Sequence, residues 1–124
     1  MAKILIVDDY IDLVELLTDF LESKGHEVET PPTVDSLYES LSHFHPDLII
    51  LDVRFRDLDG RKICKEIKLQ WSSVPIILIS ASPELLKNYK ECYADAIIEK
   101  PFDLSTIIEK VESVLGKFQR ANLN

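Results

Sequence analysis

The stretch Leu48-Ile49-Ile50-Leu51-Asp52 decides the fold of this chain. Four consecutive apolar residues, in place of an alternation of apolar and polar ones, are typical of a parallel strand that is covered on both faces. A carboxylate directly after such a run lies at the carboxyl end of the strand, which is where open α/β sheets place their chemistry. The stretch therefore predicts both a buried parallel strand and a candidate reactive residue.

Working outward, further short runs with strand character alternate with longer amphipathic stretches. The predicted strands are Ile4–Val7, Glu27–Thr30, Leu48–Leu51, Ile76–Ile79 and Ala96–Ile98. A strand–helix alternation that is repeated five times indicates a parallel sheet with helices on both faces. We expect an α/β fold, a doubly wound five-stranded parallel sheet flanked by five helices.

Apolar residues at helical spacing mark the five helices. These sets lie within residues 13–21, 34–44, 63–69, 85–89 and 104–115. Asp12 and Glu15 form a predicted capping box for the first helix, and Gly25 is its predicted stop. The fourth helix follows Pro83, a residue favoured in a first helical turn, and Asp103 is the predicted N-cap of the fifth.

The composition fits one compact domain. The chain has 124 residues, and 46% of them are hydrophobic, which is enough for a core but leaves no room for a second domain of ordinary size. We expect a single domain over residues 1–124, with an ordered core over about 3–118 and a tail over 119–124.

Charge and hydropathy narrow the function classes. The net charge of −8 argues against nucleic-acid binding, because neutralising phosphates needs a surplus of Lys and Arg. The apolar runs are too short to cross a bilayer, and Met1–Lys3 leads into a strand without the regions of a signal peptide. Cys64 and Cys92 lack metal-ligand spacing and are predicted to be buried thiols in a reducing cytoplasm.

The residues that directly follow the predicted strands carry the candidate chemistry. Asp8 and Asp9 follow the first strand and Asp52 the third, while Ser80 follows the fourth and Lys100 the fifth. Because the carboxyl ends of parallel strands meet at one edge of the sheet, we expect these side chains to gather there. Three neighbouring carboxylates repel one another unless a cation joins them.

This set of groups suits phosphoryl transfer. Carboxylate oxygens that leave room for water and phosphate are the ligands that Mg²⁺ prefers. Phosphoryl transfer needs such an ion together with a further cation and hydrogen-bond donors, which Lys100 and Ser80 can supply. Asp52 would then be the nucleophile that forms an acyl phosphate.

Five stretches of the sequence resemble the receiver domains of two-component response regulators. They are Ile4–Asp9, Pro46–Asp52, Asp59–Gly60, Pro75–Ala81 and Lys100–Phe102. They occur in the family's order with family-like spacing, and together they span nearly the whole chain. The resemblance implies a flavodoxin-like (CheY-like) strand order of 2-1-3-4-5.

The resemblance also implies a role for each site residue. Asp52 would be the phosphoacceptor, with Asp9 as a direct Mg²⁺ ligand, Asp8 acting through water, and the backbone carbonyl of Arg54 completing the protein's share of the coordination. Lys100 would pair with the phosphoryl group, and Ser80 would move to hydrogen-bond it. The peptide bond between Lys100 and Pro101 is expected to be cis.

On this basis we expect a signalling domain and not an ordinary enzyme, since its chemistry would be limited to its own aspartyl phosphorylation and dephosphorylation. The donor would be a phosphohistidine of a sensor kinase or of a phosphotransfer protein, and the phosphorylated domain would switch a protein-interaction surface. A phosphorylation-dependent dimer is an open alternative. We expect no contact of this domain with nucleic acid or membrane, and a cytoplasmic location.

Several departures from the family pattern bear on switching. Arg56-Asp57 stands where the family usually has Pro-Gly, which predicts a less rigid loop. Ile97 stands where the family usually has an aromatic residue, so the usual ring rotation is not expected. The stretch between Ser80 and Lys100 is short, which predicts a short or mobile fourth helix.

Other function classes compete with this one. An interaction module that keeps the fold without phosphorylation is the main alternative, and a haloacid-dehalogenase-type hydrolase is disfavoured because Arg54 stands where that class has a second Asp. A flavodoxin is also disfavoured, because no Ser-, Thr- and Gly-rich phosphate loop follows the first strand.

Two sets of side chains have no assigned role in the site. Tyr10, Arg54 and Phe55 are expected either at the site entrance or as incidental residues at the solvent edge. The remaining expectation is that the histidines lie at the surface or in loops: His26, His43 and His45.

The sequence leaves the cognate kinase, the output and the oligomeric state open. It also leaves open whether the domain stands alone or belongs to a longer protein, and how a signal passes without an aromatic residue at Ile97.

Overall fold

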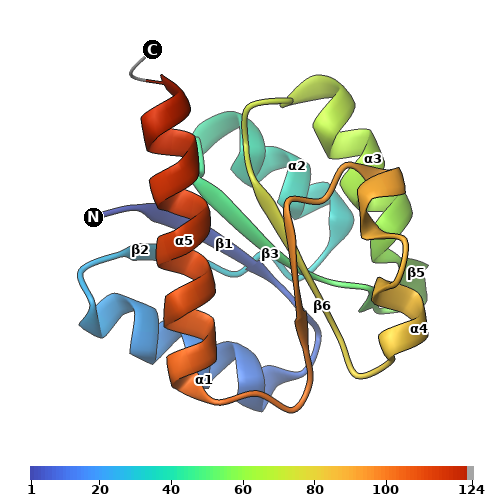
Figure 1. Cartoon of the computed structure of the whole chain (residues 1–124), viewed down its shortest axis with the longest axis horizontal. Coiled ribbons are helices and arrows are strands. Elements are labelled where there is room, and N and C mark those ends of the chain that lie inside the picture. Colours follow the sequence, from blue (N-terminus) through green and yellow to red (C-terminus); the bar gives the residue numbers. More distant parts are fainter. Residues whose placement is uncertain (123–124) are drawn as a thin grey trace.

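A computed structural model describes residues 1–122, with side chains as far as Lys117, and shows a central parallel sheet (Figure 1). Its strands are β1 (Lys3–Val7), β2 (Glu27–Glu29), β3 (Leu48–Asp52), β6 (Ile76–Ser80) and β7 (Ala96–Glu99). The order β2-β1-β3-β6-β7 is the expected order 2-1-3-4-5, and all neighbours are parallel. The predicted fold class is confirmed, and each predicted strand is correct to within one residue at its ends.

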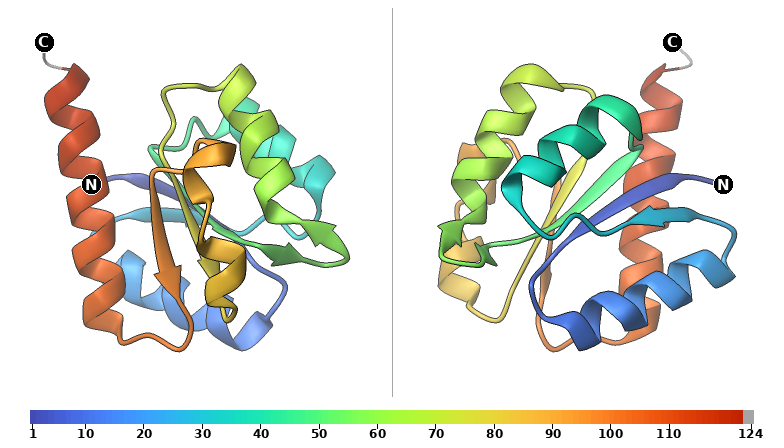
Figure 2. Two further views of the ribbon diagram at one scale, coloured as in Figure 1. Left: turned by 45° about the vertical axis from the view of Figure 1, so that its right-hand side comes forward. Right: turned by 180° about the vertical axis from the view of Figure 1, so that it is seen from behind.

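Helices cover both faces of the sheet (Figure 2). On one face lie α1 (Ile11–Ser23) and α5 (Leu104–Asn122). On the other face lie α2 (Val34–His43), α3 (Gly60–Gln70), α4 (Pro83–Leu86) and the 3₁₀ turn η1 (Tyr89–Cys92). Leu48 and Ile50 pack toward the first face and Ile49 and Leu51 toward the second, which explains why the first four positions of β3 are all apolar.

Several predictions at helix ends are wrong. The capping box predicted at Asp12 and Glu15 is wrong, because α1 begins at Ile11 and Tyr10, with extended backbone, takes the N-cap position. A capping box forms instead at the start of α2, between Thr33 and the residue three positions on. Leu69, expected to mark the buried face of the third helix, is 72% exposed at the end of α3.

Other predicted helix boundaries lie at the end of α1 and at both ends of α5. Gly25, with a φ of 91°, follows Lys24, the C-cap residue of α1, and confirms the predicted stop. The backbone carbonyl of Asp103 accepts from the N–H groups of Thr106 and Ile107, as an N-cap position should. Residues 119–122, expected in a tail, continue α5, and positions 123 and 124 lie outside the described residues.

A small antiparallel hairpin follows β3, made of β4 (Arg54–Phe55) and β5 (Leu58–Asp59). The sequence did not predict it, because strands of two residues have no readable periodicity. Phe55 is fully buried beneath the hairpin, so its predicted place at the site entrance or the solvent edge is wrong. The hairpin carries Asp59 as the N-cap of α3, whose side chain accepts from the Arg61 N–H.

The segment between β6 and β7 is as short in helix as its sequence predicts. The fourth helix, α4, is a single turn, as predicted, and it is followed by η1. Ile97 of β7 is partly buried and packs against the core on this face. The bond between Lys100 and Pro101 is cis, as the resemblance implied. Across residues 1–122, no helix combines the length and the apolar character that a membrane crossing needs.

Candidate metal and phosphoacceptor site

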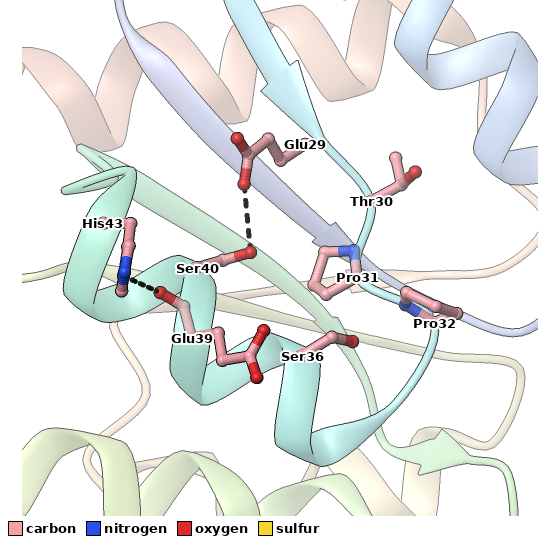
Figure 3. A pocket seen from close by; sticks show the side chains of 8 residues that line it. All are labelled: Glu29, Thr30, Pro31, Pro32, Ser36, Glu39, Ser40 and His43. Atoms are coloured by element: carbon pink, nitrogen blue, oxygen red, sulfur yellow. Dashed lines mark hydrogen bonds between the residues drawn. The ribbon is translucent and has the colours of Figure 1, made fainter.

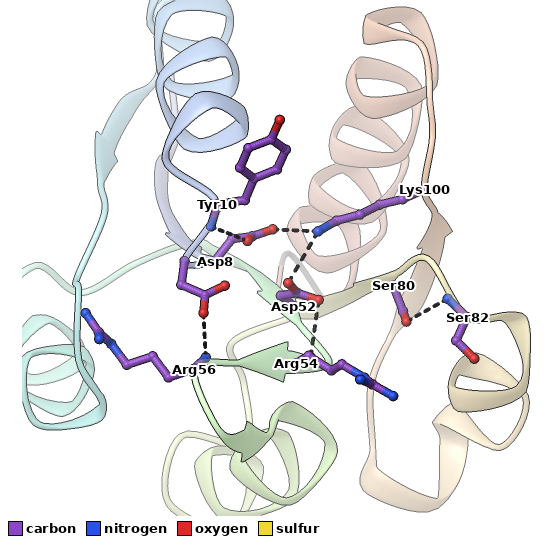
Figure 4. Close-up of polar contacts among 9 residues, drawn as sticks. Asp8, Tyr10, Asp52, Arg54, Arg56, Ser80, Ser82 and Lys100 are labelled. Atoms are coloured by element: carbon purple, nitrogen blue, oxygen red, sulfur yellow. Dashed lines mark hydrogen bonds and ion pairs between the residues drawn. The ribbon is translucent and has the colours of Figure 1, made fainter.

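The carboxyl edge of the sheet brings the predicted acidic residues together (Figure 4). Asp8 and Asp9 follow β1, and Asp52 ends the neighbouring strand β3. One oxygen atom from each of these three carboxylates lies within 4.8 Å of the other two. The sequence prediction that they form one cluster is confirmed.

Lys100, which follows β7, reaches into this cluster. Its Nζ donates to Asp8 Oδ2 at 2.9 Å and to Asp52 Oδ2 at 3.3 Å. The Asp8 side chain is fully buried, and the Asp52 side chain is 10% exposed. The backbone of Lys100 is fixed by its own N–H, which donates to the carbonyl of Ser80 at 2.8 Å. One ammonium group thus contacts two of the three carboxylates, and the cluster is short of positive charge.

The ionisation of Asp52 and Lys100 reflects this imbalance. Burial, followed by the charge of Asp8, raises the pKa of Asp52 to about 6, although Lys100 opposes the shift. Burial lowers the pKa of Lys100, but its hydrogen bonds and charge attraction to Asp8 and Asp52 outweigh burial and raise it. Lys100 therefore stays charged, while the carboxylates remain only partly compensated.

Backbone N–H groups orient all three carboxylates. Asp8 Oδ1 accepts from the N–H of Tyr10 at 2.9 Å, and Asp52 Oδ1 accepts from the N–H of Arg54 at 3.2 Å. Asp9 Oδ2 accepts from the N–H of Arg56, across the site on the hairpin, at 3.0 Å. These bonds hold an oxygen-only donor set that is short of positive charge, which fits a hard divalent cation such as Mg²⁺.

Ser80 lies at the same edge but points away from Asp52 (Figure 4). It is buried, and its Oγ accepts from the N–H of Ser82 at 3.0 Å. The hydroxyl would have to turn toward Asp52 to donate to a phosphoryl group there, and this movement of Ser80 stays a prediction. Tyr10, 60% exposed, and Arg54, also exposed, lie at the rim of the site.

Sequence reasoning missed two contacts at this edge, the N–H groups of Arg56 and Ser82. Backbone donors carry no residue signature, so no pattern in the sequence marks them. The Arg54 carbonyl remains a predicted Mg²⁺ ligand, because the described contacts of Arg54 at the site involve its N–H.

A groove of about 620 Å³ lies beside the site, between β2 and α2 (Figure 3). Its polar groups pair with one another: Ser40 Oγ donates to Glu29 Oε1 at 3.0 Å, and His43 Nδ1 lies 3.1 Å from the Glu39 carbonyl. His43 and His45 are exposed, and the partly buried His26 lies in the loop before β2, so the predicted surface or loop positions are confirmed. The chemistry of the described residues concentrates at the sheet edge, not in this groove.

Comparison with known proteins gives the class. A sequence model of the response regulator receiver domain matches residues 4–112. The alkaline phosphatase synthesis transcriptional regulatory protein PhoP of Bacillus subtilis is 33% identical over 121 residues, which cover 96% of this chain and 50% of that protein. The nisin biosynthesis regulatory protein NisR of Lactococcus lactis is 36% identical over 121 residues, with 95% and 52% coverage.

A solved structure agrees with this result. The receiver domain of NtrX from Brucella abortus superposes with a TM-score of 0.85 at 32% identity, covering 91% of this chain and 98% of that one. The chain therefore belongs to the family of response regulator receiver domains and is a receiver domain of a two-component system. It spans about half the length of the curated relatives that it matches.

Proposed function

We propose that this receiver domain accepts a phosphoryl group on Asp52, in a reaction that depends on Mg²⁺. The donor is a phosphohistidine of a sensor kinase or of a phosphotransfer protein. The observation that carries the proposal is the convergence of Asp8, Asp9 and Asp52 with Lys100 at the carboxyl edge of the sheet.

Four residues would hold the metal: Asp8, Asp9, Asp52 and, through its carbonyl, Arg54. When bound, Mg²⁺ supplies positive charge to the oxygens of the transferring phosphoryl group. A carboxylate oxygen of Asp52 attacks the phosphorus, so that an O–P bond forms while the P–N bond to the donor histidine breaks. The electron pair of that bond stays on the imidazole, which takes up a proton.

Lys100 and Ser80 assist at the same phosphoryl group. The ammonium of Lys100 already contacts Asp52 and lies where negative charge develops on the phosphoryl oxygens. By rotating inward, Ser80 gives up the bond that its Oγ accepts from the Ser82 N–H and donates its hydroxyl to a phosphoryl oxygen. The chemistry of the domain is limited to forming and losing its own aspartyl phosphate.

A small phosphodonor tests the acceptor. Incubation with Mg²⁺ and acetyl phosphate should add one acid-stable, base-labile phosphoryl group to the wild type, as measured by intact mass. Asp47→Ala, which removes an exposed acid from the opposite edge of the sheet, should be modified like the wild type, and Asp52→Ala should remain unmodified. The same adduct on Asp52→Ala would place the acceptor elsewhere.

Thermal stability tests the metal. Mg²⁺ that binds only the native state should stabilise the fold by about 1.4 kcal/mol at ten times its dissociation constant. Asp9→Ala should lose most of this gain. Thermal melts with and without Mg²⁺ measure it, and an equal Mg²⁺ response in both proteins would contradict the proposed site.

A partner protein must bring its phosphohistidine to Asp52, and the rim of the site suits such contact. Tyr10 and Ile11 at the start of α1 are 60% and 69% exposed, which is unusual for large apolar side chains beside a buried polar site. We propose that the donor protein covers them. A cytoplasmic location is part of the proposal, and the free thiols of Cys64 and Cys92 support it.

The output surface follows from the movement of Ser80. Ser82 begins the segment that contains α4 and η1, so the loss of its bond to Ser80 Oγ would disturb residues 82–93. Ile97 is branched at Cβ and restricted in χ1, so we expect it to respond little. Hydrogen exchange with and without beryllofluoride should change mainly over 82–93, and equal protection of this segment in both states would redirect attention to residues 53–60.

A further inference from the structure

Arg56, at the turn of the β4–β5 hairpin, has a backbone conformation that its residue type disfavours. Its φ is 56°, in the left-handed region where a side chain costs free energy and glycine is favoured. A non-glycine residue persists in this region only when the surrounding contacts hold it there. The contacts of Arg56 therefore need an explanation.

Two hydrogen bonds hold Arg56 in place, and Figure 4 shows the one that its backbone N–H donates. Its backbone N–H donates to Asp9 Oδ2 at 3.0 Å. Its side-chain Nε donates to the carbonyl of Pro32 at 2.7 Å, in the loop between β2 and α2. The side chain thus joins the hairpin to a loop whose two consecutive prolines, Pro31 and Pro32, restrict its backbone.

Asp9 is the cluster member that most needs such support. Asp8 and Asp52 are buried, and each is held by a neighbouring N–H and by Lys100. Asp9 is exposed, so its carboxylate can turn toward water at little cost, and the N–H of Arg56 holds it at the cluster. That N–H is correctly placed only while the hairpin turn keeps its position.

We propose that Arg56 is a positioning residue for the metal site. Its side-chain bond to Pro32 fixes the hairpin turn, and the backbone N–H of the same residue orients Asp9 for Mg²⁺. This inference rests on the proposed function, because it concerns the affinity of the Mg²⁺ site that phosphorylation requires. Outer partners that orient a metal ligand commonly change metal affinity by 10–100-fold when they are lost.

The charge of Arg56 makes the inference easy to test. Removing a cation near a Mg²⁺ site should tighten Mg²⁺ binding if only electrostatics acts. Loss of the positioning contact should weaken it. The two explanations therefore predict opposite signs for Arg56→Ala. Lys62→Ala, which removes an exposed cation of α3 from outside the acidic cluster, serves as the charge control.

The experiment is a Mg²⁺ titration of the ¹⁵N-labelled full chain at constant ionic strength, followed through the amide signals of residues 8–10. We expect a dissociation constant about tenfold higher in Arg56→Ala and no increase in Lys62→Ala. Arg56→Gly, which tolerates the left-handed φ but lacks the side chain, should be weakened like Arg56→Ala. Wild-type affinity in Arg56→Gly would mean that the backbone conformation alone positions Asp9, and would overturn the proposal.

A double-mutant cycle with Asp9 identifies the route of the effect. If Arg56 acts through Asp9, Arg56→Ala should not weaken Mg²⁺ binding further in an Asp9→Ala chain. Thermal melts in EDTA establish that each variant folds. If Asp9→Ala binds Mg²⁺ as the wild type does, the proposed function fails at its metal site. If Asp9→Ala is weakened but Arg56→Ala is not, only the role of Arg56 fails.

Discussion

The two edges of the same sheet use aspartate in opposite ways. At the amino edge, Asp47 Oδ2 accepts from the N–H of Lys3, and Asp95 Oδ2 accepts from the N–H of Ile76, both at 2.8 Å. Each of these carboxylates therefore satisfies the first backbone donor of a strand. At the carboxyl edge, three carboxylates lie close together, and only two of them pair with the one ammonium group of Lys100.

The difference indicates what each edge contributes. An aspartate that completes a backbone hydrogen bond stabilises the fold, and Asp95 also pairs with Lys68 at 3.0 Å. An aspartate that faces like charges costs stability until a cation arrives. Such a stability cost at the carboxyl edge is common at functional sites, and it agrees with the function proposed for these residues.

The largest expected effect concerns Gly60, where the backbone at the carboxyl edge is closely packed. A Cβ at Gly60 would collide with the carbonyl of Asp52 and would lie 2.9 Å from the Cα of Val53. Gly60→Ala should therefore lower the free energy of unfolding by about 3 kcal/mol, since neither backbone atom can move aside cheaply. Urea unfolding measures this loss.

Gly116 in α5 is the matched control for Gly60. No described heavy atom outside its own helix lies within 4 Å of a Cβ built there. Gly116→Ala should raise the free energy of unfolding by about 0.5–1 kcal/mol, because alanine restricts the unfolded chain more than glycine. Equal effects of the two substitutions would contradict the close backbone packing at the carboxyl edge.

The second prediction concerns the amino edge. Asp95→Ala removes the acceptor of the Ile76 N–H and one of the partners of Lys68, whose side chain is only 9% exposed. We expect a loss of about 2 kcal/mol in the free energy of unfolding. Asp47→Ala, with one exposed hydrogen bond at stake, should lose about 0.5–1 kcal/mol. Urea unfolding measures both losses. If Asp95→Ala were as stable as the wild type, the stabilising role of aspartate at the amino edge would be contradicted.

The third prediction is that removing a carboxylate at the carboxyl edge does not lower the free energy of unfolding, unlike at the amino edge. Asp52→Asn removes one of three neighbouring charges, and the amide oxygen can still accept from Lys100. In EDTA the free energy of unfolding should stay the same or rise by about 1 kcal/mol. The stabilisation by Mg²⁺ should shrink. A loss above about 1 kcal/mol in EDTA would mean that this carboxylate stabilises the apo fold.

The residues at each edge of the sheet could be predicted from the sequence better than the hydrogen bonds that they form. Continuous apolar runs such as Leu48–Leu51 have one physical explanation, burial on both faces, so the strands and the gathering of Asp8, Asp9 and Asp52 could be predicted. The β4–β5 hairpin could not, because it depends on the left-handed backbone at Arg56 and not on a repeating pattern.

Local propensity also failed where tertiary contacts decide. Asp12 and Glu15 have the spacing of a capping box, but the N–H of Tyr10 is taken by the Asp8 side chain and the helix starts at Ile11. Leu69 is predicted to lie on the buried face of α3, but it is two, five and six residues from Ile67, Cys64 and Ile63 and not three, four or seven, so it lies on another face of the helix and is exposed. Hydrophobic spacing predicts which helices form, and packing decides where their buried faces end.

The smallest expected effect concerns pH and again has opposite signs at the two edges. At the amino edge, His26 Nδ1 accepts from the N–H of Ala2 at 3.0 Å, and burial lowers the pKa of His26 below 6.5. The unfolded chain then takes up this proton before the native state does, so stability should fall as the pH drops below about 6.5. The raised pKa of Asp52 works the other way, because the native state binds that proton first and gains stability as the pH falls through about 6.

Separating the two edges therefore requires a chain in which Asp52 cannot titrate. In an Asp52→Asn chain, the free energy of unfolding should fall between about pH 7 and pH 5.5, and His26→Gln should flatten this slope, because glutamine can accept from the Ala2 N–H without taking up a proton. Urea unfolding across this range provides the measurement. An unchanged slope in His26→Gln would assign the acid sensitivity to groups other than His26 and would remove the amino edge from the pH response.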